Sequence, residues 1–261
     1  MARTQDLIRP PSDGWTTVFL ENHDQARSIT RFTSDAPEHR VPGGKMLALM
    51  MCALSGTLFI YQGQEIGMTN FPLSWDMSEY KDVDSTNYYK MVATRSNNDT
   101  KALEAAHRSL QHLARDHARV PISWSNALHN GFSPPDASAK PWMRPLEDAN
   151  VCNAEQQQTD KSSVLAFWKT MLRIRKEHAD LLVHGQYDDL SVDDSRFFVF
   201  TKTWMGEKAL CVCNFTDKGT EIVLPEEVKG LKRELLISSV EEGQFAEDQL
   251  KAFEGRIYLL V

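Results

Sequence analysis

The chain contains, at residues 16–25, the stretch Thr16-Thr17-Val18-Phe19-Leu20-Glu21-Asn22-His23-Asp24-Gln25. Its first half is apolar or β-branched and predicts a buried strand, which ends where the polar half begins. Lys45–Leu54, after the turn residues Pro42-Gly43-Gly44, is apolar nearly all round and predicts a short covered helix. Leu58–Tyr61 predicts a second buried strand, again followed by polar residues. Strand, helix and strand in this order predict a parallel βαβ unit, whose strands read as continuous apolar runs.

The remainder of the chain divides into a helical part and a strand-rich part. A helix is expected at about Asp99–Asp116, and the clearest helical pattern is Ser162–Leu182, with Asp160 or Ser162 as its cap. After Gly185, short apolar or alternating runs are separated by turn residues, which predicts a small antiparallel sandwich. The expected strands are Arg196–Trp204, Lys208–Phe215, Thr220–Leu224, Arg233–Ile237 and Arg256–Val261. These patterns predict an α/β domain over residues 1–184 and an all-β domain over residues 185–261.

The composition is that of an ordinary globular protein with a mild acidic excess. The 261 residues include 29 Lys and Arg against 36 Asp and Glu, a formal net charge of −7, and 41% are apolar. This balance argues against a protein that binds nucleic acid by neutralising phosphates. The first fifteen residues do not resemble a secretory signal, and no apolar run reaches the ~18 residues that a membrane span needs. The four scattered cysteines are expected to be reduced and buried, so the sequence predicts a cytoplasmic protein without membrane or nucleic-acid partners.

Asp24 is the first candidate for chemistry because it follows directly on a predicted parallel strand. Ligands and catalytic groups of α/β proteins gather beyond the carboxyl ends of such strands. A single aspartate at this place is more often a helix cap or a turn residue, and that alternative stands beside the functional one. The neighbours His23 and Gln25, with Arg27 and Arg31 close behind, favour a binding cluster.

Five segments, in order, resemble one enzyme family. Residues 19–28, FLENHDQARS, resemble the strand-7 signature of glycoside hydrolase family 13, the α-amylase family. The form is that of the α-glucosidases, especially the fungal maltases, isomaltases and oligo-1,6-glucosidases. The four later segments are residues 56–67 (GTLFIYQGQEIG), 80–84 (YKDVD), 115–121 (RDHARVP) with Trp124, and 130–133 (NGFS) with 140–142 (KPW). The resemblance implies the C-terminal portion of a (β/α)8 TIM barrel, strands 7 and 8 with their helices, followed by a small antiparallel β-sandwich.

The resemblance also implies roles for particular side chains. Asp24 corresponds to the family's third carboxylate, which hydrogen-bonds the hydroxyls of the cleaved glucose ring and stabilises oxocarbenium-like charge. His23 would bond a neighbouring hydroxyl, and Gln25 would lie near the leaving-group sugar. Arg115 would serve the same subsite while Arg119 lines the approach; without the family, the two arginines read as a solvated basic turn. The implied ligands are oligosaccharides of the maltose or isomaltose type, with no cofactor and no metal.

Other polar and aromatic side chains are interpreted as structural. Glu65 follows the second strand and invites pairing with Asp24 as an acid–base couple, but we interpret it as a structural anchor because the family assigns this segment no catalytic role. Trp75, Trp124 and Trp142 are interpreted as packing under loops rather than as platforms for sugars. Packing is also expected for Met46, Met50, Met51 and Met68, and for the helix stripe formed by Val164, Leu165, Trp168, Met171, Leu172, Arg175, His178 and Leu182.

The two carboxylates that perform retaining hydrolysis have no counterpart in this sequence. Such enzymes need a nucleophile and a general acid/base about 5–5.5 Å apart; in the family these follow strands 4 and 5, and nothing before Trp15 resembles either motif. We therefore expect an α-glucosidase-type hydrolase of α-1,4 or α-1,6 glucosidic bonds that is an incomplete chain and inactive alone. The alternative is a non-catalytic sugar-binding or interaction remnant of the same family. Two further alternatives are a transporter heavy chain, which needs a membrane anchor, and an isomerase or trehalose-forming enzyme.

Overall fold

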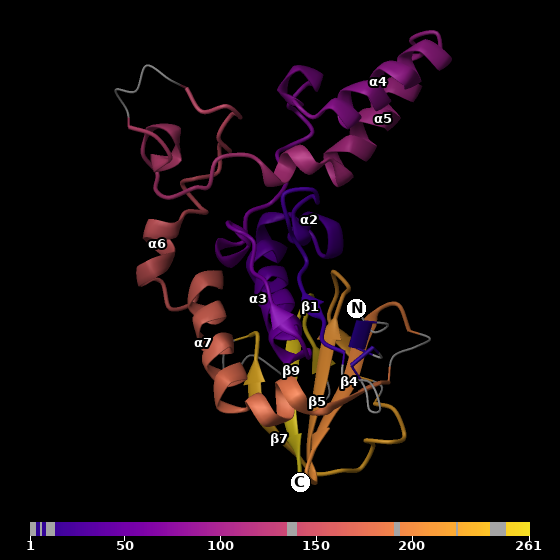
Figure 1. Cartoon of the computed structure of the whole chain (residues 1–261), viewed down its shortest axis with the longest axis vertical. Coiled ribbons are helices and arrows are strands. Elements are labelled where there is room, and N and C mark those ends of the chain that lie inside the picture. The colour runs from indigo at the N-terminus through magenta and orange to yellow at the C-terminus, as the bar shows by residue number, and fades with distance from the viewer. Residues whose placement is uncertain are drawn as a thin grey trace. The chain divides into compact units, whose positions relative to one another are not determined.

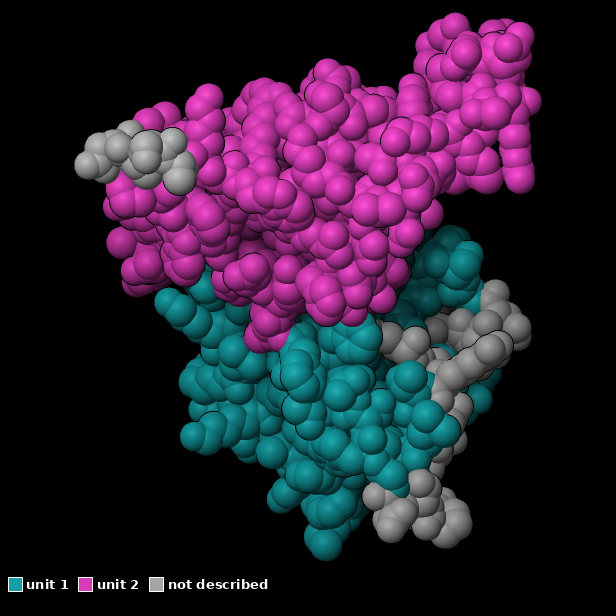
Figure 2. All heavy atoms as spheres, turned by 45° about the horizontal axis from the view of Figure 1, so that its top comes forward, with its two compact units in different colours: residues 1–19, 36–59, 162–261 teal, residues 20–35, 60–161 magenta. Residues whose placement is uncertain are grey.

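The computed structural model describes residues 4–5, 7–8, 14–134, 140–190, 194–222, 224–240 and 249–261. The chain forms two compact units, each assembled from separate stretches of sequence and coloured separately in Figure 2. Unit 1 comprises Met1–Phe19, Ala36–Phe59 and Ser162–Val261, and unit 2 comprises Leu20–Asp35 and Ile60–Lys161. Because these units alternate along the chain, they do not test the division expected between residues 184 and 185, which stays a prediction.

Unit 1 contains the predicted strand–helix–strand unit. Strand β1 (Thr17–Val18) pairs in parallel with β2 (Thr57–Leu58), and helix α3 (Pro37–Ala53) connects them. Both strands are shorter than expected, since each has one partner among the described residues. Hydrogen bonds from Thr57 N to Thr16 O and from Phe59 N to Val18 O, both 2.9 Å, hold the pair. The parallel βαβ prediction is confirmed.

Helix α3 begins eight residues earlier than predicted. We expected Pro42-Gly43-Gly44 to interrupt the chain, but these residues lie inside the helix. Pro42 removes the helical hydrogen bond to the carbonyl of Glu38, and the helix nevertheless continues through it. Every residue from Gly43 to Ala53 is buried, so the expectation of a helix covered on all sides is confirmed, as is the packing role of the four methionines.

Helix α7 (Val164–Glu177) packs against α3 and confirms the strongest helical pattern of the sequence. The cap is Ser163, whose hydroxyl accepts from Ala166 N at 3.1 Å, so both predicted caps are wrong. Within the predicted stripe of packed residues, Arg175 is buried. The prediction is wrong for Leu172, which is exposed. Arg175 donates to three carbonyls at the end of α3 and the start of β2, over 2.6–2.7 Å: Cys52, Leu54 and Gly56. A π-helical turn, Asp180–His184, follows.

The rest of unit 1 is antiparallel β-structure, as predicted (Figure 1). A five-stranded sheet has the order β3-β4-β5-β9-β7, and β6 pairs with β8 in a small second sheet. The bounds are β3 Gln186–Asp189, β4 Phe197–Trp204, β5 Glu207–Asn214, β6 Thr220–Glu221, β7 Arg233–Ser238, β8 Gln249–Leu250 and β9 Gly255–Leu260. All five expected strands are present. Two strands were not predicted: β3, which is a polar edge strand, and β8, which has only two residues.

Unit 2 consists of helices and turns. Its α-helices are α2 (Ser28–Phe32), α4 (Val83–Arg95), α5 (Thr100–Leu113) and α6 (Ala154–Thr159). Its 3-10 turns are Gln64–Ile66, Met77–Glu79, Arg115–Ala118 and Leu128–Gly131. Helix α5 is the one expected near Asp99–Asp116, and it packs against α4 as a helical hairpin (Figure 1). Helix α4 was not predicted because its hydrophobic pattern is weak.

Two further expectations concern membranes and cysteines. Among the described residues, no helix combines the length and the apolar character needed to cross a bilayer. Cys52, Cys152, Cys211 and Cys213 are all buried thiols.

Candidate functional site

The polar run that follows β1 folds into a tight turn in unit 2. The backbone N–H of Asp24 donates to the side-chain oxygen of Asn22 at 2.8 Å, and Gln25 N donates to Asn22 O at 3.3 Å. This turn leaves the Asp24 side chain 48% exposed, and its Oδ2 lies 3.2 Å from His23 Nε2. The turn therefore presents His23 and Asp24 together.

Both predicted arginines converge on the Asp24 carboxylate. Arg119 Nη2 lies 2.9 Å and Arg115 Nη1 3.3 Å from Asp24 Oδ1. Arg119 Nε also donates to the carbonyl of His23 at 3.0 Å. The interpretation of the two arginines as a solvated basic turn is therefore wrong, because both make ion pairs within the cluster.

The 3-10 turn Arg115–Ala118 positions the two arginines so that both reach the same carboxylates, those of Asp24 and Asp82. Arg115 is the first residue of this turn and Arg119 caps its end. Like charges four residues apart in a helical turn repel by a few tenths of a kcal/mol, and shared carboxylates offset that repulsion.

Gln25 lies apart from the Asp24 ion pairs. Its Oε1 accepts from Arg31 Nη1 at 3.0 Å, and the same Arg31 atom donates to Leu20 O at 3.3 Å. The structure thus brings together His23, Asp24, Arg115 and Arg119, whereas Gln25 is held by a neighbouring contact.

Asp82, for which the sequence suggested no role, organises the arginines. Nε and Nη2 of Arg115 each lie 2.6 Å from Asp82 Oδ1, and Arg119 Nη1 lies 3.6 Å from the same atom. Asp82 also caps helix α4, since its Oδ2 accepts from Ser85 N at 3.3 Å. Burial alone would raise the pKa of the Asp82 carboxyl, but the hydrogen bonds from Arg115 and Ser85 outweigh it and hold this pKa below its usual range. An aspartate one residue before a helix is a cap signal, and Asp82 also lies in the family-like segment 80–84, but neither feature predicts its contact with the arginines.

A second, outer carboxylate completes the cluster. Asp84 Oδ2 lies 3.0 Å from Arg115 Nη2, and its side chain is 83% exposed. Hydrogen bonding to Asp82 and the charges of Asp82 and Asp84 raise the pKa of Arg115, which therefore stays cationic. We call Asp24, Asp82, Asp84, Arg115 and Arg119 the aspartate–arginine cluster.

Two fully buried residues, Asp116 and His117, lie next to the cluster in the turn that carries Arg115. Asp116 Oδ2 accepts from the backbone N–H groups of Lys81 (3.1 Å) and Asp82 (3.0 Å), which fixes the start of α4 against the turn that carries Arg115. Burial raises the pKa of Asp116 despite these bonds. His117 Nε2 lies 2.9 Å from Leu110 O, and burial lowers the pKa of His117 to about 4, which keeps the ring neutral.

A buried ion pair anchors the base of the turn itself. Arg27 and Glu21 are both about 1% exposed, and Nη1 of Arg27 lies 3.0 Å from Glu21 Oε2. The other Glu21 oxygen accepts from Ser28 N (2.8 Å) and Ser28 Oγ (2.6 Å), and Arg27 Nη1 also donates to Gln62 O at 2.7 Å. Through Arg27, these bonds connect the polar segment after the first predicted strand, at Glu21, with the polar segment after the second, at Gln62.

The three tryptophan candidates differ in burial, and Glu65 lies between the extremes. Trp75 is buried and stacks on Phe71 with ring centroids 4.9 Å apart, so the packing interpretation is confirmed for it. That interpretation is wrong for Trp124 and Trp142, which are exposed; backbone bonds on both sides of Trp124 hold its loop without covering the ring. Glu65 is half-buried, burial raises its pKa, and its role as a structural anchor stays a prediction.

The aspartate–arginine cluster borders an open cavity of about 290 Å3. Asp24, Asp82, Asp84 and Arg115 line it together with Tyr88 and the apolar Leu110 and Leu113. Carboxylate acceptors and guanidinium donors around a partly apolar surface suit a polyhydroxylated ligand, whose hydroxyls both donate and accept. Across the described residues, no group of three or more His, Cys, Asp or Glu is placed to hold a metal ion.

Comparisons with known proteins agree with these observations. The family model described as "Alpha amylase, catalytic domain" matches residues 1–185. An α-glucosidase from Candida albicans is 40% identical over 262 residues, which cover 99% of this chain and 44% of the relative. An oligo-1,6-glucosidase from Saccharomyces cerevisiae is 38% identical over 251 residues, covering 95% of this chain and 42% of the relative.

A solved structure shows the same arrangement of the backbone. The isomaltulose synthase of Klebsiella sp. LX3 superposes with a TM-score of 0.86 at 29% identity, over 100% of this chain and 45% of that one. The chain thus spans less than half the length of the relatives it matches. The predicted fold class, part of a (β/α)8 barrel followed by an antiparallel sandwich, is confirmed by these matches. The family model, the fungal relatives and the shared fold show that this chain belongs to the α-amylase family, glycoside hydrolase family 13.

Proposed function

We propose that unit 2 supplies the sugar-binding part of an α-glucoside hydrolase site, with Asp24 as the carboxylate that binds the hydroxyls of the cleaved glucose ring. One observation supports this most directly. Arg115 and Arg119 both hold Asp24 Oδ1, at 3.3 and 2.9 Å, while the side chain remains 48% exposed. A carboxylate oriented in this way offers free acceptor positions to two neighbouring hydroxyls.

The charges of the cluster suit the transition state of glycoside cleavage. Three carboxylates against two guanidinium groups leave one negative charge beside the cavity. A glucoside is neutral, whereas its transition state carries oxocarbenium-like positive charge, so this surplus stabilises the transition state more than the ground state. Hydrogen bonds from sugar hydroxyls to Asp24 would strengthen as that charge develops.

The names of the relatives suggest the substrate class. The Candida protein is named an α-glucosidase and the Saccharomyces protein an oligo-1,6-glucosidase. We infer α-1,4- or α-1,6-linked gluco-oligosaccharides, such as maltose and isomaltose, as ligands of this chain. We also propose a cytoplasmic location, which the four buried thiols support because disulfides mark oxidising compartments.

We infer that these 261 residues bind glucosides without hydrolysing them, and the cluster supports this inference. Asp24, Asp82 and Asp84 all form ion pairs with Arg115 or Arg119. A general acid must be protonated, whereas carboxylates that pair with arginine act as anions, so none of the three suits that role. The acid of the reaction would therefore be supplied by a residue outside the cluster, and the assignment of Asp24 to the sugar hydroxyls leaves the nucleophile to another residue as well.

Binding and turnover of the purified chain test this proposal together. We expect millimolar maltose or isomaltose to bind in an NMR titration, and no release of p-nitrophenol from p-nitrophenyl α-glucoside. Asp24→Asn should abolish the binding, whereas Asp194→Asn, at an exposed ion pair with Arg196 in unit 1, should leave it unchanged. Turnover that Asp24→Ala abolishes would overturn the inference of inactivity, and binding that survives Asp24→Asn would overturn the assignment of the site.

A further inference from the structure

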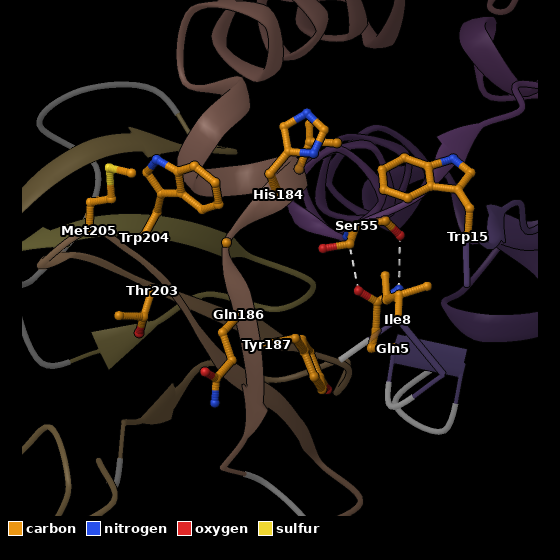
Figure 3. A pocket seen from close by; sticks show the side chains of 12 residues that line it. Gln5, Ile8, Trp15, Ser55, His184, Gln186, Tyr187, Thr203, Trp204 and Met205 are labelled. Atoms are coloured by element: carbon orange, nitrogen blue, oxygen red, sulfur yellow. Dashed lines mark hydrogen bonds between the residues drawn. The ribbon is translucent and has the colours of Figure 1, made fainter. Parts of the chain in front are cut away.

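Unit 1 contains a second cavity, which does not involve the aspartate–arginine cluster. Its volume is about 350 Å3, within the range of small-molecule sites, about 300–1,000 Å3. Trp15 before β1, Ser55 after α3, His184 at the end of the π-helical turn, Gln186 on β3 and Trp204 on β4 contribute to its walls (Figure 3). We call it the tryptophan pocket.

Three aromatic side chains form one wall of the tryptophan pocket. The ring of His184 lies between those of Trp15 and Trp204, with centroid distances of 5.9 and 6.4 Å (Figure 3). Trp15 is 55% exposed, and its Nε1 donates to Thr57 Oγ1 at 2.8 Å, which fixes the orientation of the ring. Aromatic faces carry partial negative charge and attract polarised C–H groups, so a row of rings can face consecutive pyranose rings.

Two polar side chains lie at the edge of the pocket, on the other face of the sheet from Trp204, because consecutive strand residues point to opposite faces. Gln186 and Thr203 are directly paired across strands β3 and β4, so they share one face of the sheet. Both line the pocket, and together they offer a carboxamide and a hydroxyl that can donate and accept. Gln5 is used differently: its amide bonds Ser55 N and Ser55 O at 2.9 and 3.0 Å and closes one side (Figure 3).

The charge of the lining restricts the class of ligand. None of the twelve described residues that line the pocket is Asp, Glu, Lys or Arg. The ammonium of Lys202 donates to the Ser55 hydroxyl but does not itself line the cavity. Sites for phosphates, nucleotides or carboxylates carry cationic groups, so this lining selects an uncharged ligand with both apolar faces and hydroxyl groups.

Backbone strain at the rim is a further sign of function. Met205 and Gly206 form the two-residue turn between β4 and β5, and both have positive φ, 46° and 93°. Asn or Gly is preferred at the first of these positions because larger side chains are strained there. Met205 nevertheless occupies it, lines the pocket and is 91% exposed. Strain of this kind concentrates at binding sites.

We propose that the tryptophan pocket is a second saccharide site, which binds a short neutral oligosaccharide. The pyranose rings lie against the row Trp15–His184–Trp204. The site holds substrate or product chains without cleaving them. The choice of α-gluco-oligosaccharides as the ligand rests on the proposed function, whereas the preference for a neutral saccharide rests on the pocket alone.

Maltotriose is the probe, and the indole N–H resonances of the tryptophans report where it binds. We expect the resonances of Trp15 and Trp204, assigned with Trp→Phe variants, to shift in a saturable titration. Trp204→Ala should weaken this titration by about tenfold, equivalent to a loss of about 1.4 kcal/mol. Met205→Asn should weaken it while preserving the turn, because asparagine tolerates positive φ. Trp142→Ala, which removes an exposed tryptophan of unit 2, should leave it unchanged.

Asp24→Asn separates this inference from the proposed function. If Trp15 and Trp204 titrate normally in that variant while binding at the cluster is lost, both proposals stand. If the two resonances do not shift although binding that depends on Asp24 persists, the second saccharide site is wrong and the proposed function remains. If they titrate but Asp24→Asn changes no binding, the proposed function is wrong and the tryptophan pocket remains. If maltotriose binds nowhere, both are overturned.

Discussion

Arg115 and Asp82 make a two-pronged contact, in which Nε and Nη2 of the arginine each lie 2.6 Å from one oxygen of the aspartate. Asp82 is buried and is the N-cap residue of α4, whereas Arg115 begins the turn that follows α5. The contact therefore fixes the position of Arg115 before any ligand arrives. Asp24, at 3.3 Å from the same guanidinium, is held by a group that is already immobilised.

Asp82→Asn should weaken maltose binding by about tenfold, because Arg115 loses its charged partner and Asp24 loses its fixed neighbour. The asparagine oxygen can still cap Ser85, so the helix should persist. Asp84→Asn is the matched control: it removes another carboxylate from the same arginine, but the side chain is 83% exposed, and exposed ion pairs contribute little. NMR titrations of the two variants provide the comparison, and equal losses of affinity would contradict this role of Asp82.

Breaking the Glu21–Arg27 pair should destabilise the protein by about 3–5 kcal/mol, because one buried charge is left without its partner. Arg27→Met is the test variant, measured by the denaturant midpoint. Arg173→Met breaks an exposed pair with Glu177 and should cost less than about 1 kcal/mol. The double variant Glu21→Leu/Arg27→Met should recover part of the loss, and a cost for Arg27→Met similar to that of Arg173→Met would refute the prediction.

Acidification should destabilise unit 2 through His117. Burial lowers the pKa of His117 to about 4, so the unfolded chain takes up a proton near pH 6.5 while the folded chain resists it. Stability is therefore present above pH 6.5 and is lost as the pH falls towards 4, by up to ~3 kcal/mol. Asp116, whose pKa is raised by burial, acts in the opposite sense because its folded form binds a proton more readily.

Chemical denaturation at several values between pH 7 and pH 4 measures this slope. His117→Gln, which can still donate to Leu110 O, should flatten it, whereas His112→Gln, at an exposed histidine of the same unit, should change it little. An unchanged slope in His117→Gln would show that another group controls the acid response.

The strained turn between β4 and β5 predicts a stabilising substitution. Met205→Asn should raise stability by about 1 kcal/mol, because asparagine adopts positive φ at lower cost. Gly206→Ala should have the opposite effect, since φ is 93° there. Thermal unfolding of the two variants measures both shifts, and a destabilised Met205→Asn would mean that the methionine side chain contributes more to the fold than its exposure suggests.

The sequence predicts elements well where one local pattern dominates. The run from Thr16 to Leu20 and the helix around Trp168 were both identified, because burial on one or all sides leaves a clear pattern of apolar residues. The start of α3 was predicted too late because of Pro42. A proline in the second turn of a helix cannot be told from a helix breaker unless the start of the helix is already known. Strand β3 was missed because its residues, Gln186–Asp189, are mostly polar at the edge of the sheet.

The candidate site was predictable in its residues but not in its arrangement. The motif around Asn22-His23-Asp24 and the loop from Arg115 to Arg119 are 91 to 97 positions apart and carry family resemblance, which is why they were identified. Asp82 carries an ordinary cap signal, and only the folded chain shows that this cap also binds Arg115. The tryptophan pocket joins segments from Gln5 to Met205, which no local pattern connects.

The order of strands in the five-stranded sheet has a consequence for synthesis on the ribosome. Strand β9 lies between β5 and β7, yet it is translated after both of them. Until residues 255–260 emerge, β5 and β7 each have an unpaired edge, and such edges favour pairing with other chains. Helix α3 packs against β9 but is translated some two hundred residues earlier, so these contacts cannot form until β9 is synthesised. Unit 1 is thus assembled late and as a whole, and nascent chains are most exposed to aggregation and to chaperones just before β9 appears.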